Sequence, residues 1–161
     1  MANKLPIEIF MPPNILKAKV GSIAGGIDMA AVKRAESAMD GLKSEFTDWL
    51  ASDVTRLAEC RDKLAKSPNA ATRSDLFRAA HDLKGQAATY EYPMIARIAS
   101  SLTKLIESTD ASRDVPLGLI DAHVAAIRVV FRDKIQTMTD MIAKTLTEEL
   151  EARVAETLSA A

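Results

Sequence analysis

Residues 79–93 read AAHDLKGQAATYEYP, and they combine a helical pattern with an abrupt stop. At ~100° per residue, one face of this helix is apolar and comprises Leu76, Ala80, Leu83, Ala87 and Tyr90. Pro93 ends the pattern, because proline has no backbone N–H and clashes with the preceding turn. The stretch therefore predicts a helix that begins near Thr72 or Ser74, runs to Tyr90 and buries one face in a core.

The composition of the whole chain is typical of an all-α protein. The chain has 161 residues, of which 48% are hydrophobic but only 4% are aromatic. Ala, Leu, Ile, Val and Met supply most of the apolar side chains, a bias toward helix formers rather than the aromatic residues that strands favour. The length is that of one domain with a single core.

Three more helices are predicted from apolar residues that recur every three or four positions. They cover approximately residues 28–67, 93–107 and 116–158. The last of them contains no glycine or proline after its first turn. Trp49 is expected in the core. Four amphipathic helices with short loops predict an antiparallel four-helix bundle, whose first and last helices are long enough to extend past its ends.

These patterns divide the chain into three parts. Residues 1–27 form an N-terminal arm, since prolines and glycines interrupt any helix there. Residues 28–135 form the bundle, and residues 136–161 are expected to be a C-terminal extension of the last helix. The arm also carries Ile, Leu and Phe side chains, so we expect it to lie over a groove on the domain. A disordered arm, or one reserved for a partner, stays an alternative.

Charge and cysteine content exclude several classes of protein. Twenty-one basic and 22 acidic residues give a net charge of −1, so a global field that attracts nucleic acid or an anionic membrane is missing. Cys60 is the single cysteine, which excludes an internal disulfide and a cysteine-based zinc cluster. No stretch resembles a signal peptide or reaches the roughly 18 apolar residues of a membrane span. We expect a cytoplasmic protein without a metal or cofactor of its own.

The outer face of the 79–93 helix carries a group of residues suited to phosphoryl chemistry. Within about 60° of His81 lie Phe77, Lys84, Gly85 and Ala88. A neutral exposed imidazole is a competent nucleophile, and the Lys84 ammonium can offset the charge of a phosphoryl group. Gly85 costs the helix about 1 kcal/mol relative to alanine, which suggests that a partner approaches the ring closely. Local positive charge is expected from Arg73, Arg78 and Arg97.

Simpler interpretations of these residues remain open at this point. An exposed histidine can be an ordinary surface residue, and a helical glycine can merely relieve close packing between helices. The other histidine, His123, lies at the edge of an apolar stripe, where a structural role is expected.

The stretch HDLKGQAATY, residues 81–90, resembles the histidine-containing phosphotransfer (HPt) domain of multistep two-component signalling. That family has a helical His-x-Leu-Lys-Gly motif followed by small residues. The stretch MIARIASSLTKLIE, residues 94–107, is similar to its third helix, and the resemblance covers roughly residues 28–135.

The resemblance implies that His81 is phosphorylated, that Lys84 is its charge partner and that Gly85 gives access to the ring. It places Thr103 where the family has a side chain that orients the imidazole. Two positions depart from the family pattern: Gln86 replaces the usual small residue, and Glu91 replaces a glycine common at the end of the helix.

The implied activity is a relay in which the imidazole accepts a phosphoryl group from an aspartate of one receiver domain and passes it to another. Response-regulator receiver domains and a hybrid or separate sensor histidine kinase are the implied partners, and the receivers supply Mg²⁺. The chain has no glycine-rich ATP-binding segment, so we expect a phosphoryl carrier without kinase activity of its own. A monomer is expected, with a dimer through the terminal helix as the alternative.

Two other functions stay open. One is a helical adaptor that keeps the fold but is not phosphorylated. The other is the dimerisation and phosphoacceptor segment of a sensor kinase, although such segments usually place a proline five residues after the histidine, where this chain has Gln86.

Overall fold

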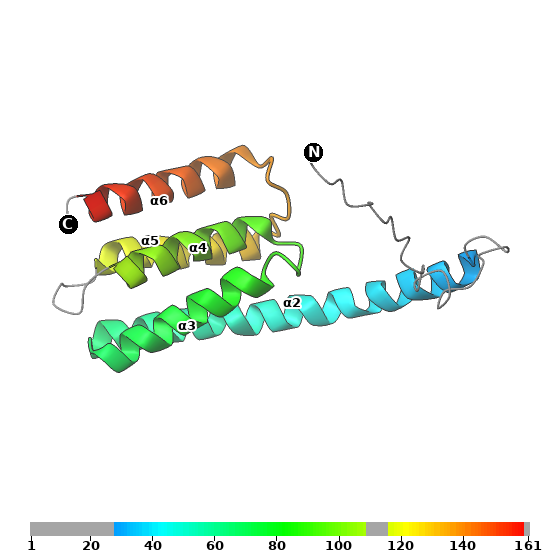
Figure 1. Ribbon diagram of the computed structural model, residues 1–161, viewed down its shortest axis with the longest axis horizontal. Coiled ribbons are helices and arrows are strands. Elements are labelled where there is room, and N and C mark those ends of the chain that lie inside the picture. The colour runs from blue at the N-terminus through cyan, green and yellow to red at the C-terminus, as the bar shows by residue number, and fades with distance from the viewer. Residues whose placement is uncertain (1–27, 109–115, 160–161) are drawn as a thin grey trace, which may run out of the picture. The chain divides into compact units, whose positions relative to one another are not determined.

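The computed structural model describes residues 28–108 and 116–159, and every element within them is an α-helix (Figure 1). The helices are α2 (Met29–Lys66), α3 (Ala70–Gln86), α4 (Pro93–Ser108), α5 (Leu117–Arg132) and α6 (Met141–Ser159). The arm predicted for residues 1–27 lies outside the described part. The chain divides after Asp40 into two units, and the second unit holds the core and every candidate site residue. The prediction of an all-α bundle is confirmed.

The first helix begins and ends where the sequence predicts. The Asp28 carboxylate accepts a hydrogen bond from the Ala30 N–H at 2.9 Å, as an N-cap residue does. The buried face of α2, however, starts only at Leu50 and continues through Val54, Leu57 and Leu64. The expectation that Trp49 lies in the core is wrong, because 47% of its surface is exposed.

The start of helix α3 is fixed by a capping box of two side chains. At its start, the Asn69 side chain accepts from the Thr72 N–H at 3.0 Å, and the Thr72 hydroxyl accepts from the Asn69 N–H at 3.1 Å. This capping box starts the helix at Ala70, slightly before the predicted position. The inward face is as predicted: Leu76, Ala80, Leu83 and Ala87 are buried, and Tyr90 is half-buried.

The turn after α3 is a Schellman motif with Glu91 at its left-handed position, φ 65°. The Tyr92 N–H donates to the Ala87 carbonyl at 2.8 Å, and the Glu91 N–H donates to the Ala88 carbonyl at 3.2 Å. Glycine is the usual residue at such a φ. Glu91 adopts the same left-handed conformation, so the turn is kept although the residue differs from the family pattern.

His123 has the structural role that its position in the sequence predicts. It is fully buried on α5, its Nδ1 is 2.8 Å from the Leu119 carbonyl, and its Nε2 is 3.1 Å from the Ser101 hydroxyl of α4. A proton on Nδ1 satisfies both contacts, since Nδ1–H then donates to the carbonyl and Nε2 accepts from the hydroxyl. Burial lowers the pKa of this imidazole.

The single long helix predicted for residues 116–158 is wrong, because the chain turns between α5 and α6. Helix α5 ends in a second Schellman motif, with Lys134 at φ 53°. The Ile135 N–H donates to the Val130 carbonyl at 3.0 Å, and the Lys134 N–H donates to the Phe131 carbonyl at 3.1 Å. Helix α6 starts afresh, because the Asp140 carboxylate accepts from the Ala143 N–H at 2.8 Å.

Helix α6 folds back onto the bundle and packs against α4 and α5 (Figure 1). Its inward residues, Ala143, Thr147, Leu150 and Val154, are buried. Arg97 of α4 forms a two-pronged ion pair with Glu151 of α6, at 2.8 and 2.6 Å. Residues 141–159 therefore belong to the core structure and do not extend α5. No helix in the described part of the chain is long and apolar enough to cross a membrane.

Candidate functional site

The outer face of α3 presents the group of residues that the sequence singled out. His81, Lys84 and Gly85 are all exposed, as the helical pattern predicts. The imidazole lies against the half-buried ring of Phe77, with the ring centroids 5.9 Å apart and the planes at 31°. Phe77 is itself packed on the core, so it supports one side of the imidazole while the rest stays in solvent.

Neither ring nitrogen of His81 makes a hydrogen bond to the residues that the structure describes. The bond expected from Thr103 is not made, because this residue is buried and its hydroxyl donates to the Ser100 carbonyl of its own helix at 2.8 Å. A threonine hydroxyl inside a helix commonly bonds a carbonyl of the preceding turn. Both nitrogens of the imidazole are therefore open to a partner.

Two cations flank the histidine on the same helix. Lys84 and Arg78 are exposed, and neither has an ion pair with any residue in 28–108 or 116–159. The other two arginines expected to contribute are engaged elsewhere: Arg73 donates to the Ile106 carbonyl at the end of α4, and Arg97 pairs with Glu151. The local positive charge beside His81 thus comes from Lys84 and Arg78.

Gly85 is not required for the packing of the helices. Apart from its chain neighbours and the adjoining backbone of α3 itself, a Cβ built at this position meets no atom within 4 Å, so the residue relieves no close contact between helices. The interpretation that this glycine only allows two helices to pack is therefore wrong. What the missing side chain leaves open is the outer surface, one turn from the imidazole.

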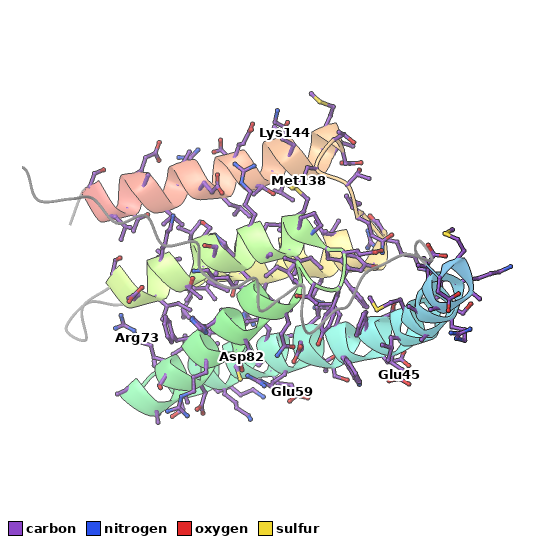
Figure 2. The ribbon with its side chains drawn as sticks, turned by 45° about the vertical axis from the view of Figure 1, so that its right-hand side comes forward. Glu45, Glu59, Arg73, Asp82, Met138 and Lys144 are labelled. Carbon is purple, nitrogen blue, oxygen red and sulfur yellow. The ribbon has the colours of Figure 1, made fainter. Side chains whose placement is uncertain are left out.

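An ion pair that the sequence did not reveal lies next to the histidine. Asp82 faces α2, where the Arg56 guanidinium donates to its carboxylate; Figure 2 labels Asp82 on α3 beside α2. Both side chains are nearly half exposed. Asp53 lies close enough to interact with both, and burial raises the pKa of its carboxyl, an effect that Arg56 opposes. The pair is 26 residues apart in the chain, and no pattern in the sequence connects the two positions.

The remaining predicted residues complete the face toward the end of α3. Gln86 is exposed and accepts a long hydrogen bond from the Tyr90 hydroxyl, at 3.4 Å. Ala88 is exposed, and its small side chain leaves the surface open one turn beyond Lys84. Gly85, Gln86 and Ala88 therefore form an exposed, uncharged surface between the imidazole and the turn at Glu91.

Comparison with family models gives a match to the Hpt domain over residues 41–156, most of the chain. The match continues past residue 135 and includes most of α6. Searches of curated proteins and of solved structures found no match. The chain therefore belongs to the Hpt domain family.

Proposed function

We propose that His81 is the phosphoryl carrier of this chain, because Hpt domains carry out histidine phosphotransfer in phosphorelays. The observation that carries the proposal is an exposed imidazole next to the exposed ammonium of Lys84 and the open surface at Gly85; within residues 28–108 and 116–159, neither the ring nitrogens nor this ammonium has a polar partner. His123, in contrast, is buried and uses both of its ring nitrogens inside the protein.

The proposed reaction is a reversible in-line transfer. A lone pair on one ring nitrogen of His81 attacks the phosphorus of an aspartyl phosphate, the N–P bond forms, and the aspartate leaves with the electron pair of the broken P–O bond. The other ring nitrogen keeps its proton. In the return step an aspartate of a second receiver attacks the phosphorus, and the imidazole leaves. Lys84 faces the transferring oxygens, and the receivers bring Mg²⁺ and the aspartates.

The proposed partners are response-regulator receiver domains and a hybrid or separate sensor histidine kinase. Their acidic phosphorylation pockets suit the positive charge of Arg78 and Lys84. The chain acts as a carrier, which means that it stores the phosphoryl group between two receivers and needs no ATP site.

An adaptor that binds partners without being phosphorylated is the second candidate. One observation favours it: no side chain in the described part of the chain orients the imidazole, since Thr103 is turned to Ser100. An unoriented ring is a slower nucleophile, because fewer of its orientations are productive.

Labelling separates the two candidates. A purified receiver phosphorylated with acetyl phosphate is mixed with the chain, and in parallel the chain is phosphorylated directly with phosphoramidate. We expect acid-labile, alkali-stable phosphate on the native chain and none on His81→Gln. Equal labelling of His81→Gln contradicts the carrier. A native chain that resists both reagents supports the adaptor.

A further inference from the structure

The His81 imidazole rests against the ring of Phe77, one turn earlier on α3. The two ring centroids are 5.9 Å apart and the planes meet at 31°, a separation at which aromatic side chains attract one another. The contact follows from helix geometry, because side chains of an α-helix lean toward its N-terminus, over the residues three and four positions earlier. The imidazole therefore leans over Phe77.

Phe77 is a firm support, because the core holds its ring. The ring is half-buried and packs against buried core residues. Its helical neighbours Leu76 and Ala80 are fully buried and anchor this turn of α3. An exposed side chain changes its rotamer freely in water. Stacking on a fixed ring removes part of this freedom from His81, because each orientation that leaves Phe77 loses the contact.

The other side of the imidazole is kept free by Gly85. A side chain at this position would lean back over His81, in the same way that His81 leans over Phe77. Glycine has no side chain, and a Cβ built there lies within 4 Å of no atom of another helix. Phe77 thus closes the side of the imidazole that faces the start of α3, and the side that faces Gly85 stays open to a partner.

Stacking takes the place of a hydrogen bond in limiting the directions of the ring. Thr103 is turned to Ser100, and no other side chain in the described part of the chain bonds the imidazole. A stacked imidazole keeps its plane close to that of Phe77, and the lone pair of the attacking nitrogen lies in this plane. A receiver that docks on the Gly85 side therefore meets this nitrogen in a restricted set of directions, which favours in-line transfer.

We propose that Phe77 is a positioning residue of the phosphotransfer site and that it orients the imidazole by stacking. The inference rests on the proposed role of His81 as the phosphoryl carrier, and Phe77 acts only through that ring. The contact energy of an aromatic pair corresponds to about a two- to tenfold change in a rate. Removal of the Phe77 ring should therefore slow transfer from a docked receiver by about this factor.

Three variants separate the ring from the packing of the core. Phe77→Leu keeps an apolar side chain on the core and removes the aromatic face. Phe77→Tyr keeps the ring and should transfer at the native rate. The matched control is Phe131→Leu on α5, because Phe131 is also half-buried against the core and its ring contacts Tyr92 at a centroid distance of 5.8 Å. Urea unfolding should show a similar loss of stability in both leucine variants, without slower transfer in the control.

Single-turnover transfer over a range of phosphorylated receiver concentrations separates orientation from docking. For Phe77→Leu we expect a limiting rate about two- to tenfold below the native one, with an unchanged half-saturating concentration. Phosphoramidate, a small reagent that needs no docked geometry, should label this variant at least as fast as the native chain. A native limiting rate in Phe77→Leu overturns the proposal, as does equal slowing in Phe131→Leu. A change confined to the half-saturating concentration also overturns it, because Phe77 is then a docking contact.

Proton NMR of the unphosphorylated chain tests the orientation without any phosphotransfer. The ring current of Phe77 shifts the imidazole signals of His81, which are identified by their loss in His81→Gln. These signals should move toward those of free histidine in Phe77→Leu and stay in place in Phe131→Leu. Unchanged signals in Phe77→Leu overturn the proposal. If the signals move as expected but the native chain takes up no phosphate on His81, the carrier function has failed and the stacking contact has not.

Discussion

Replacement of Gly85 by alanine should separate the stability of α3 from its function. A Cβ at this position meets no atom within 4 Å apart from its chain neighbours and the adjoining backbone of α3, so it introduces no clash with another helix. Alanine is about 1 kcal/mol more favourable than glycine inside a helix, and Gly85 lies in the last turn of α3, where the gain is at most that amount. For a chain of this size, we expect the melting temperature to rise by roughly 2–4 °C per kcal/mol gained.

The same substitution should slow phosphotransfer, because the added methyl group stands where a receiver must approach the imidazole. Urea unfolding followed by circular dichroism gives the stability, and the initial rate of label transfer from a phosphorylated receiver gives the function. Gly85→Leu should slow transfer further, because its side chain is larger. A less stable Gly85→Ala chain would refute our account of the packing, and a more stable chain with an unchanged transfer rate would refute the close approach.

Four further results are expected. Lys84→Ala should slow transfer from a receiver and leave the circular dichroism spectrum unchanged, since this side chain has no partner in the described part of the protein; an unchanged rate removes the lysine from the mechanism. Arg56→Gln leaves the Asp82 carboxylate uncompensated beside the histidine and should slow transfer, whereas adding Asp82→Asn should restore the rate; failure of that rescue would mean that Arg56 contacts the receiver itself. Stability should be full above pH 6.5 and fall as the pH drops below it, because burial lowers the pKa of His123 in the folded chain and the unfolded chain takes up the proton first; urea midpoints that do not change between pH 8 and pH 5.5 would contradict this. Lys134→Gly should raise the free energy of unfolding by up to about 1 kcal/mol, since glycine adopts φ 53° without strain; a loss of stability would argue against the turn.

The sequence predicted those features that a single helix determines by itself. The inward face of α3 and the bounds of α4 follow from apolar periodicity and from Pro93. The outward direction of His81 follows from the same rotation of about 100° per residue along the helix. The chemistry of the site residues was readable for the same reason, because His81, Lys84 and Gly85 lie on one face of one helix.

Features that depend on distant parts of the chain were not predictable in this way. The turn after α5 uses Lys134 in a left-handed conformation, and no glycine or proline marks it; Asp140, as the N-cap of α6, is the one signal that was available. Trp49 was placed in the core because it continues the three-and-four spacing of the apolar residues of α2, yet it lies one position before Leu50, where the buried face of the helix begins. The Arg56–Asp82 ion pair required knowledge of how α2 lies against α3.

The central claim is that His81 alone carries the phosphoryl group. Nitrogen-15 NMR of the histidine rings, recorded while the chain reacts with phosphoramidate and then with an unphosphorylated receiver and Mg²⁺, tests this residue by residue. The account predicts that the His81 ring signals move on phosphorylation and return when the receiver takes the group, while those of His123 stay in place. Movement of the His123 signals with those of His81 unchanged would contradict it.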